Sequence, residues 1–272
     1  MKRKTPKTIK MASKMARNIV PILGISLDST EAAEVLNVVI GYVLEKKRCL
    51  IVTPNPEIVV RAQRDNTLRK IINQADFSLP DGKGLVWASG GRIKERIAGI
   101  DFAEDLLREA GRRGWKVFLL GGKEGVAAKA AQAQSVKLKA KNNNAKFKII
   151  GESGPWLDED GKPMDEREAR VEKKTIDKIK RFSPDIVLVG FGPPKQEKWI
   201  KMHQGDFSPT LWMTVGGAFD LWSGKIKRAP LLVQDLGLEW AWRLLQEPRR
   251  ARRIFTAVVE FPLRVLWHNL RH

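Results

Sequence analysis

Apolar runs that alternate with helical patterns constrain the fold of this chain more than any other feature of its sequence. Continuous runs such as WKVFLL and DIVLV are typical of strands that are buried on both faces of a parallel sheet. The alternation therefore predicts an α/β fold with a doubly wound, mostly parallel, Rossmann-like sheet. The predicted strands are residues 20–25, 49–53, 77–79, 115–120, 147–151, 185–190 and 211–215. The predicted helices are residues 30–45, 56–74, 84–88, 101–113, 125–139, 166–182 and 194–203.

Composition narrows the class of protein further. The 272 residues are 43% hydrophobic and 30% charged, which is typical of a folded chain rather than a disordered one. The only cysteine, Cys49, excludes an intramolecular disulfide and a cysteine zinc cluster. No apolar run reaches the ~18 residues that cross a bilayer. The histidines His203, His268 and His272 lie away from the predicted strand ends, which argues against histidine catalysis and histidine metal sites.

The chain is strongly basic, and its excess charge is concentrated at the two ends. A total of 50 Lys and Arg against 31 Asp and Glu gives a formal net charge of +19, which predicts an anionic partner: nucleic acid, an anionic membrane or a phosphorylated substrate. Residues 1–17, a basic N-terminal extension, carry +7, and residues 225–272 carry +6. Basic ends favour an anionic surface over a central nucleic-acid groove, although residues 1–17 also fit a solubilising tail. No secretion signal is expected, because the apolar run at 19–25 is short and contains Pro21.

Residues 236–272 are predicted to form a helical appendage to an α/β catalytic domain at residues 18–235. From Pro248 onward, basic side chains fall on one side of a helix and bulky apolar side chains on the other, which is typical of an interfacial membrane helix. Pro262 is expected to kink or divide this helix. Docking on the protein's own core, or a dimer contact, is the alternative interpretation. The arginines predicted to contact the membrane are Arg249, Arg250, Arg252 and Arg253.

Ligands of doubly wound folds bind beyond the carboxyl ends of the strands, where loops lead into helices. Thr53 and Asn55 present short hydrogen-bonding side chains after one predicted strand, and Asn55 also fits a helix N-cap. Asp81 follows the next strand in a Pro-Asp-Gly turn, where it is either an N-cap or a general base for a hydroxyl group. Arg96 is either a surface arginine or a fork for a diphosphate.

Three later junctions combine glycines with polar residues. Gly122 lies in GGKEG, which resembles a phosphate-binding helix start but is a weak signal for a dinucleotide. The stretch that begins at Gly192 puts Lys195 and Gln196 in the first turn of a helix, near its positive end, which indicates an anion nearby. Asp220, after a Gly-Gly pair, either caps a helix or accepts hydrogen bonds from a base or sugar.

Other motifs do not support a site. The sequence contains no P-loop and no G-x-S-x-G elbow. The run DED at 158–160 looks like the D-x-D metal motif of sugar-nucleotide transferases, but it lies in a polar excursion at 152–166 rather than at a strand end. A solvated turn is therefore predicted there, and a solvated loop is predicted at 137–146.

Taken together, these stretches resemble the bacterial TagA/WecG/CpsF glycosyltransferase family, glycosyltransferase family 26. The matching stretches span about residues 20–254 in the family's order and read TPNPEIV, LPDGKGLVWAS, ERIAGIDF, FGPPKQEKWI and GGAFDLWSGKIKRAPLLVQDLGLEWAWRLLQEPRRARR. The resemblance implies transfer, with inversion, of N-acetylmannosamine or a related sugar from a UDP donor to undecaprenyl-diphosphate-linked N-acetylglucosamine. It implies no required metal or other cofactor, and a product that enters teichoic acid or another cell-surface polysaccharide.

The resemblance also implies residue roles. Asp81 is implied as the catalytic base, Arg96 as the group that offsets leaving-group charge, and Gln196 as a neighbour of the diphosphate. Asp220 is implied to hold the uracil, and Trp156 stands where the family has an aromatic residue in its nucleotide site. The predicted catalytic residues are therefore Asp81, Arg96 and Gln196, and the predicted substrate-binding residues are Thr53, Asn55, Gly122, Trp156, Gly192, Lys195 and Asp220.

The expected partners are a UDP-sugar, the polyprenyl-diphosphate acceptor and an anionic membrane surface, without nucleic acid. The expected location is the cytoplasm, peripheral on the inner face of the cell membrane, and a homo-oligomer is compatible with the sequence. Two alternative functions stay open at this point. One is a basic nucleic-acid-binding protein, and the other is a nicotinamide-dependent oxidoreductase, which depends only on the glycines at 121–125.

Overall fold

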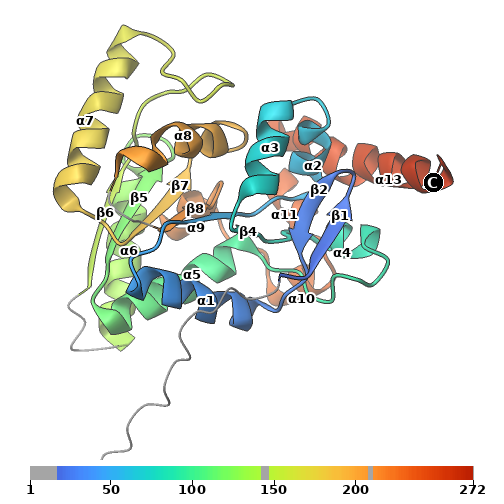
Figure 1. The fold of residues 1–272 in the computed structure, drawn as a ribbon, viewed down its shortest axis with the longest axis horizontal. Helices are drawn as coiled ribbons and strands as arrows, with labels where there is room; N and C mark the ends of the chain where they lie inside the picture. Colours follow the sequence, from blue (N-terminus) through green and yellow to red (C-terminus); the bar gives the residue numbers. More distant parts are fainter. Residues whose placement is uncertain (1–16, 142–146, 208–210, 272) are drawn as a thin grey trace, which may run out of the picture.

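The computed structural model describes residues 17–141, 147–207 and 211–271, and in these residues the centre of the molecule is a six-stranded sheet (Figure 1). All six strands are parallel, in the order β4-β3-β8-β7-β5-β6. The strands are β3 (Cys49–Val52), β4 (Phe77–Ser78), β5 (Lys116–Gly121), β6 (Lys148–Glu152), β7 (Ile186–Gly190) and β8 (Leu211–Thr214). The predicted α/β class is confirmed.

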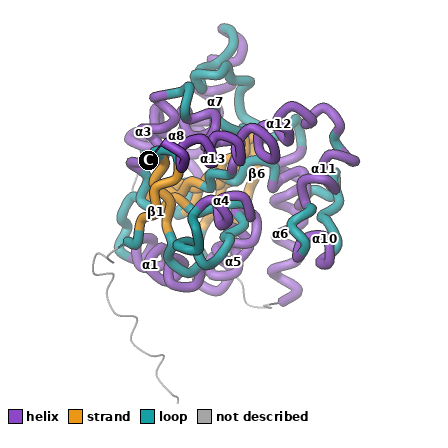
Figure 2. Tube along the Cα trace, turned by 90° about the vertical axis from the view of Figure 1, so that its right-hand side faces the viewer, coloured by secondary structure: helices purple, strands orange, loops and turns teal. Residues whose placement is uncertain are grey.

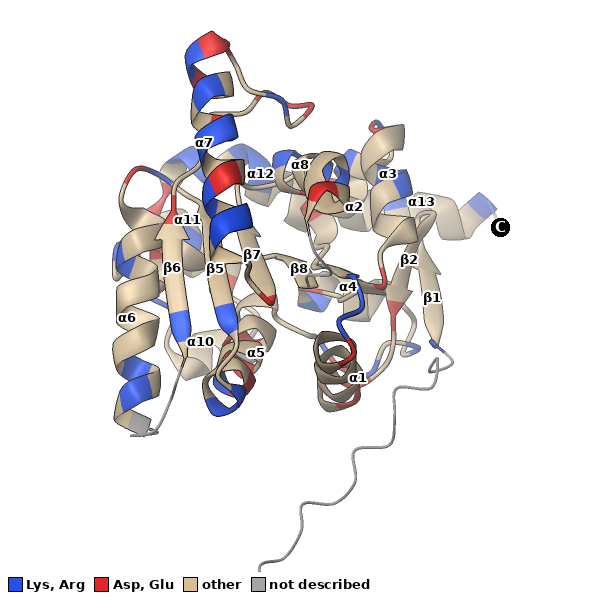
Figure 3. Ribbon diagram, turned by 60° about the vertical axis from the view of Figure 1, so that its left-hand side comes forward, with Lys and Arg blue, Asp and Glu red and all other residues tan. Residues whose placement is uncertain are grey.

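Helices cover both faces of this sheet, because successive side chains of a buried strand point to opposite faces. On one face, residues such as Leu119 and Leu188 pack against α1, α5 and α6. On the other face, Leu120 and Val189 belong to a second core with residues of α2, α3, α7 and α8. The helices are α1 (Ala32–Leu44), α2 (Pro56–Ala62), α3 (Asn66–Gln74), α4 (Lys83–Ala88), α5 (Gly99–Arg113), α6 (Val126–Lys141), α7 (Glu166–Phe182), α8 (Lys195–His203) and α9 (Ala218–Trp222). Of these, α7 projects from the body of the molecule and carries charges of both signs along its length (Figure 3).

The first apolar run does not join the main sheet. The strand predicted at 20–25 is instead an antiparallel hairpin of β1 (Ile19–Ile22) and β2 (Ile25–Asp28). Leu23 and Gly24 have φ angles of 48° and 73°, as in the tight primed turns that connect hairpin strands. Arg17 makes a two-pronged ion pair of 2.8 and 2.7 Å with the buried Asp28 of β2. The last residue of the predicted N-terminal extension thus belongs to the fold, and residues 1–16 lie outside the described residues.

Two other predicted elements differ from the structure. The helix predicted at 56–74 is divided into α2 and α3, because the Asp65 carboxylate accepts a 2.9 Å hydrogen bond from Leu68 N–H and caps a new helix. Residues 137–141, predicted as part of a solvated loop, are the last turn of α6, and residues 142–146 lie outside the described residues.

Residues 236–271, the C-terminal segment, return to the sheet after a long course along one side of the molecule (Figure 2). Phe261 and Val265 are buried in the core beside α2, so part of this segment docks on the protein itself. Its last helix then extends outward to the C-terminus (Figure 1). The C-terminal segment consists of α11 (Glu239–Gln246), the 3₁₀ turn η2 (Pro248–Arg250), α12 (Ala251–Phe255), the π-helical turn η3 (Thr256–Glu260) and α13 (Phe261–Arg271). Two shorter elements come before it, the 3₁₀ turn η1 (Gln204–Asp206) and the helix α10 (Leu231–Asp235). Across residues 17–141, 147–207 and 211–271, none of the helices combines the length and the apolar character that spanning a membrane requires.

Candidate active site

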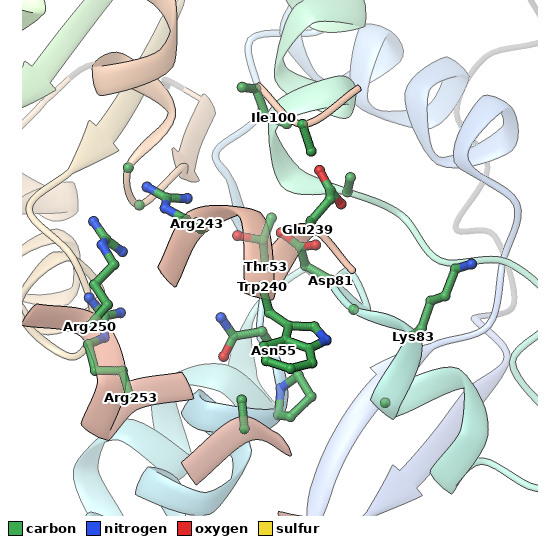
Figure 4. Close-up of a pocket in the computed structure, with 18 of the residues that line it drawn as sticks. Thr53, Asn55, Asp81, Lys83, Ile100, Glu239, Trp240, Arg243, Arg250 and Arg253 are labelled. Carbon is green, nitrogen blue, oxygen red and sulfur yellow. The ribbon is translucent and has the colours of Figure 1, made fainter. Parts of the chain in front are cut away.

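A cavity of about 610 Å³ lies between the carboxyl edge of the sheet and the C-terminal segment (Figure 4). The loops after β3, β4 and β8 form one side of it. Residues between 237 and 262 of the C-terminal segment form the opposite side. The carboxyl edge is where a doubly wound fold is expected to bind its ligands, and here a distant part of the chain covers that edge.

Thr53 and Asn55 reach the cavity from the loop after β3, as predicted. The Thr53 hydroxyl donates a 3.1 Å hydrogen bond to the Thr214 carbonyl, and the Thr53 N–H donates a 3.2 Å bond to the Thr214 hydroxyl. Asn55 Oδ1 accepts a 2.9 Å hydrogen bond from Ile58 N–H, which confirms the predicted N-cap of α2. The bond leaves the Asn55 amide nitrogen as the group that it can offer to a ligand.

Asp81 is held between two loops at the edge of the sheet. Its N–H donates a 2.9 Å hydrogen bond to the Pro54 carbonyl, and its Oδ2 accepts a 3.1 Å bond from Gly99 N–H. The alternative that Asp81 caps the helix that follows it is wrong, because Gly82 is the N-cap residue of α4. Asp81 instead binds the first N–H of α5, and its Oδ1 lies 4.0 Å from Arg96 Nε, beyond hydrogen-bonding distance.

The surroundings of Asp81 favour its neutral form and so make its carboxylate a stronger base. Burial raises the pKa of Asp81 above its usual range, and the nearby carboxylates of Glu239 and Asp101 add to this effect. The Arg96 guanidinium and Gly99 N–H act in the opposite direction. Although 35% of the Asp81 side chain is exposed, that surface lines the cavity rather than an open face of the molecule.

Arg96 is a cavity residue rather than a surface arginine. Only 20% of its side chain is exposed, and its Nη2 lies 2.5 Å from the Glu239 carboxylate. The guanidinium therefore stands between Asp81 of the sheet edge and Glu239 of α11. The role of Arg96 toward a leaving group stays a prediction.

Gln196 lines the cavity as predicted, and its side chain ties two loops together. Its Oε1 accepts hydrogen bonds of 3.2 Å from both Gly192 N–H and Gly216 N–H, which follow β7 and β8. Its Nε2 donates a 2.8 Å bond to Glu197 Oε1. Burial raises the pKa of Glu197 to about 7, although the Gln196 amide and the charges of Arg61 and Arg253 oppose the shift. Gln196 thus contributes to the shape of the cavity wall as well as lining it.

Three arginines of the C-terminal segment form a cationic cluster at one end of the cavity: Arg243, Arg250 and Arg253 (Figure 4). The Arg243 guanidinium lies directly over Gly217, where a Cβ atom would collide with it. Among the described residues, Arg243 Nη2 is buried without a hydrogen-bond partner. Burial and the neighbouring Arg243 lower the pKa of Arg250, which is the effect expected of cations held close together. The carboxylate of Glu247, 3.2 Å from Arg243 and 2.7 Å from Arg250, offsets part of the charge, and the remainder favours an anion.

The structure divides the four arginines that were predicted to contact a membrane. Arg249 and Arg252 are exposed, whereas Arg250 and Arg253 line the cavity, and Arg253 also lies 2.7 Å from Glu57 of α2. Arg250 and Arg253 thus have a place in the cavity wall that the sequence did not predict, and membrane contact stays a prediction for these arginines. Consecutive arginines in η2 and α12 point in different directions, so one helical face could not hold all four.

Five predicted substrate-binding residues are not among those that line the cavity. Gly192 lies next to the wall, because its N–H donates a 3.2 Å bond to the lining residue Gln196, whereas Gly122 N–H donates a 3.2 Å bond to the carbonyl of Gly190, which does not line the cavity. Lys195, Asp220 and Trp156 are directed elsewhere. Lys195 Nζ donates a 2.6 Å bond to the Leu157 carbonyl, Asp220 accepts a 2.9 Å bond from Lys225, and the exposed Trp156 belongs to the polar excursion.

The acidic run at 158–160 forms the predicted turn. Asp158 Oδ1 accepts 2.9 Å hydrogen bonds from the N–H groups of Asp160 and Lys162. Its two neighbours pair with basic side chains, Glu159 with Arg61 and Asp160 with Lys198. Within the part of the chain that the structure describes, no group of three His, Cys, Asp or Glu side chains could hold a metal ion.

The cavity residues that sequence reasoning missed include Glu239, Trp240 and Arg243, which all belong to α11. The i and i+4 spacing of Glu239 and Arg243 places them on one face of that helix. This spacing is the sequence signal that could have identified the two residues, but it does not indicate which part of the protein that face of α11 contacts.

The chain is similar to known proteins over most of its length. The model of the glycosyl transferase WecG/TagA/CpsF family matches residues 20–272. A protein of Staphylococcus aureus (strain MW2) is 34% identical over 242 residues, which cover 86% of this chain and 87% of the relative. A protein of Bacillus spizizenii is 34% identical over 246 residues, which cover 89% of this chain and 88% of the relative. Both are named N-acetylglucosaminyldiphosphoundecaprenol N-acetyl-beta-D-mannosaminyltransferase. Because the match extends over nearly the whole sequence, this chain belongs to the WecG/TagA/CpsF family of glycosyltransferases.

Proposed function

We propose that this enzyme transfers N-acetylmannosamine from a UDP donor to N-acetylglucosamine linked to undecaprenyl diphosphate. The names of the two relatives support the sugar and the acceptor. The observation that carries the proposal is the polarity of the cavity. Arg243, Arg250 and Arg253 gather at one end, and Asp81 lies apart from them at the carboxyl edge of the sheet (Figure 4).

The reaction is a single displacement at the anomeric carbon of the donor sugar. The acceptor hydroxyl oxygen attacks this carbon from the face opposite the diphosphate, and its proton passes to Asp81 Oδ1. A new carbon–oxygen bond forms while the bond between the anomeric carbon and the β-phosphate oxygen breaks, so that UDP leaves and the configuration inverts. A positioned base of raised pKa suits the proton transfer.

The arginine cluster is suited to the charge that grows on the departing UDP. Guanidinium groups bind phosphate oxygens through paired hydrogen bonds, and fixed charges in a partly dry site stabilise a developing anion strongly. These side chains supply the positive charge that a divalent cation supplies in D-x-D transferases, so the proposal includes no required metal.

The exposed side of the C-terminal segment supports contact with an anionic membrane, where the acceptor resides. Large apolar side chains of α12 and α13 are exposed, with Arg249 and Arg252 on the same segment. Apolar side chains beside cations are typical of helices that lie in the membrane interface. A peripheral position on the inner face of the membrane follows, and it places the cavity close to a lipid-linked substrate. Outside the cavity lining, the exposed apolar residues are Phe255 of α12, Val259 of η3, and Leu263, Leu266, Trp267 and Leu270 of α13.

The test of this function is Asp81→Asn, which keeps the shape of the side chain and removes its ability to accept the proton. We expect transfer from UDP-N-acetylmannosamine to a detergent-dispersed short-prenyl acceptor to fall about 10²–10⁴-fold. The rise in melting temperature caused by UDP should stay close to that of the parent, because Asp81 lies apart from the arginine cluster.

Asp165→Asn is the matched control, because Asp165 caps the remote helix α7 and asparagine also caps well. It should keep parental activity. Turnover of Asp81→Asn within a few-fold of the parent would contradict the role of Asp81, and a parent enzyme that UDP does not stabilise would contradict the donor.

A further inference from the structure

Glu239 connects the C-terminal segment to the residue that acts as base in the proposed function. It is the first residue of α11, and its sequence separation from Asp81 is large. Its carboxylate nevertheless lies 2.5 Å from Arg96 Nη2, while Nε of the same guanidinium lies 4.0 Å from Asp81 Oδ1. One arginine therefore faces two carboxylates, one from each side of the cavity. Figure 4 shows these two carboxylates, of Asp81 and Glu239.

The two carboxylates compete for Arg96. A guanidinium can form a close two-pronged pair with a carboxylate, and such a pair strongly stabilises the ionised form. A close pair with Arg96 would make Asp81 a weak base. In the structure the close contact belongs to Glu239, and Asp81 Oδ1 is beyond hydrogen-bonding distance of Arg96.

No other described neighbour that affects the pKa of Asp81 holds Arg96 as Glu239 does. On α5, Gly99 N–H binds Oδ2 and favours the ionised form. Asp101, also on α5, disfavours it, but its carboxylate is 2.6 Å from Arg228, which offsets its charge. From the C-terminal segment, the negative charge of Glu239 raises the pKa of Asp81.

We propose that Glu239 is a positioning residue that holds Arg96 away from Asp81, so that the base is available only when the C-terminal segment is docked. The proposal depends on the function assigned above, in which Asp81 accepts the proton. It makes a helix of the C-terminal segment part of the acid–base machinery as well as a wall of the cavity.

Glu239→Gln removes the negative charge and keeps the size of the side chain. We expect kcat to fall about tenfold or more, because Arg96 is then free to pair with Asp81. We also expect the acid limb of the pH profile of kcat/KM to move to lower pH, by about half a unit to one unit, because the pKa of Asp81 falls when a neighbouring negative charge is lost. Glu239→Ala should move the acid limb in the same direction, and Glu239→Asp, which keeps the charge, should leave it near its parental position.

Glu260→Gln is the control on the same segment, because Glu260 pairs with Arg64 and Arg264 away from the cavity. It should keep the parental rate and pH profile. Stabilisation by UDP reports whether each variant is folded. A lower rate of Glu239→Gln with an unchanged acid limb would overturn the proposal, as would a parental rate. Asp81→Asn in the same assay distinguishes the role of Asp81 as base from the role of Glu239 as positioning residue. If Asp81→Asn is inactive while Glu239→Gln keeps the parental acid limb, only the role of Glu239 is contradicted.

Discussion

Glu197 keeps a carboxyl group almost completely out of water, next to the residue that ties two loops of the cavity wall. Its side chain is 1% exposed, and burial raises its pKa from 4.5 to about 7. Among the described residues, its Oε2 has no hydrogen-bond partner. The neutral form is therefore favoured in the folded protein. As pH rises from 4.5 to 7, the unfolded chain loses this proton first, so the fold loses stability across that range and no more above it.

Glu197→Gln should remove this loss, because an amide does not ionise. The shift corresponds to about 3 kcal/mol in the free energy of unfolding, fully present above pH 7. Urea denaturation of both proteins at pH 5 and pH 8 measures it: the variant should gain stability relative to the parent as pH rises. An equal difference at the two pH values would contradict the prediction.

Among individual residues, the sequence predicted those of the cavity side formed by the sheet loops and missed those of the side formed by the C-terminal segment. Thr53, Asn55 and Asp81 were recognisable because each directly follows a strand, and the carboxyl ends of parallel strands meet at one edge. Lys195 and Asp220 follow strands too, but their side chains bind Leu157 and Lys225. Position along the chain predicts a loop's place in the fold, whereas the direction of a side chain depends on tertiary neighbours.

Among the elements, α6 packs unusually close to β6. The helix contains six alanines, and its backbone at Ala127 and Ala128 lies against Gly151, where a Cβ atom would collide with the Ala127 carbonyl. Only a glycine allows this approach. The alanine-rich helix and the strand glycine therefore act as one feature, which fixes α6 and the loop that precedes it against the edge of the sheet.

Gly151→Ala should therefore destabilise the fold by about 1–3 kcal/mol, because a helix backbone cannot move aside as a side chain can. Gly205→Ala is the matched control, since a Cβ atom there meets no other atom within 4 Å. Its melting temperature should equal the parental value or exceed it slightly. Thermal unfolding of both variants checks the prediction, and a Gly151→Ala variant as stable as Gly205→Ala would contradict the close packing.

Elements with strong periodicity were predicted well, and elements set by turns were not. All six strands of the main sheet appear near their predicted places, because continuous apolar runs leave few alternatives in a two-faced core. The hairpin at 19–28 was missed because its turn, Leu23-Gly24, interrupts the apolar pattern by only two residues. The break between α2 and α3 depends on the single cap of Asp65. A local hydrogen bond of this kind ends one helix and starts another, although the periodic pattern of apolar residues continues through the break.

For the whole molecule, we propose that the basic charge that first pointed to an anionic partner binds two kinds of anion, the diphosphate of UDP and an anionic membrane. Arg250→Ala with Arg253→Ala removes cations that line the cavity, and should abolish the stabilisation by UDP while keeping binding to anionic liposomes. Arg249→Ala with Arg252→Ala removes exposed cations instead. This pair should weaken liposome binding by about 2 kcal/mol, or about thirtyfold, and keep the effect of UDP.

Sedimentation with liposomes at low and high salt, together with melting curves with UDP, measures both properties in both double variants. High salt should reduce the difference between the second pair and the parent, because exposed charges are screened. If each pair affected both properties equally, the division of the arginines would be wrong. The family membership favours a glycosyltransferase over the nucleic-acid-binding and oxidoreductase alternatives, which share only the basic charge or the fold.

The return of the C-terminal segment to the sheet has a consequence for how the enzyme is made. A ribosome completes every strand of the main sheet before it adds Glu239, Arg243 and Arg250. Asp81 and the sheet edge that holds it are therefore synthesised before the opposite wall of the cavity. A chain ended by a stop codon before Glu239 would contain Asp81 without the arginine cluster. A complete cavity thus requires residues that are made after the whole sheet.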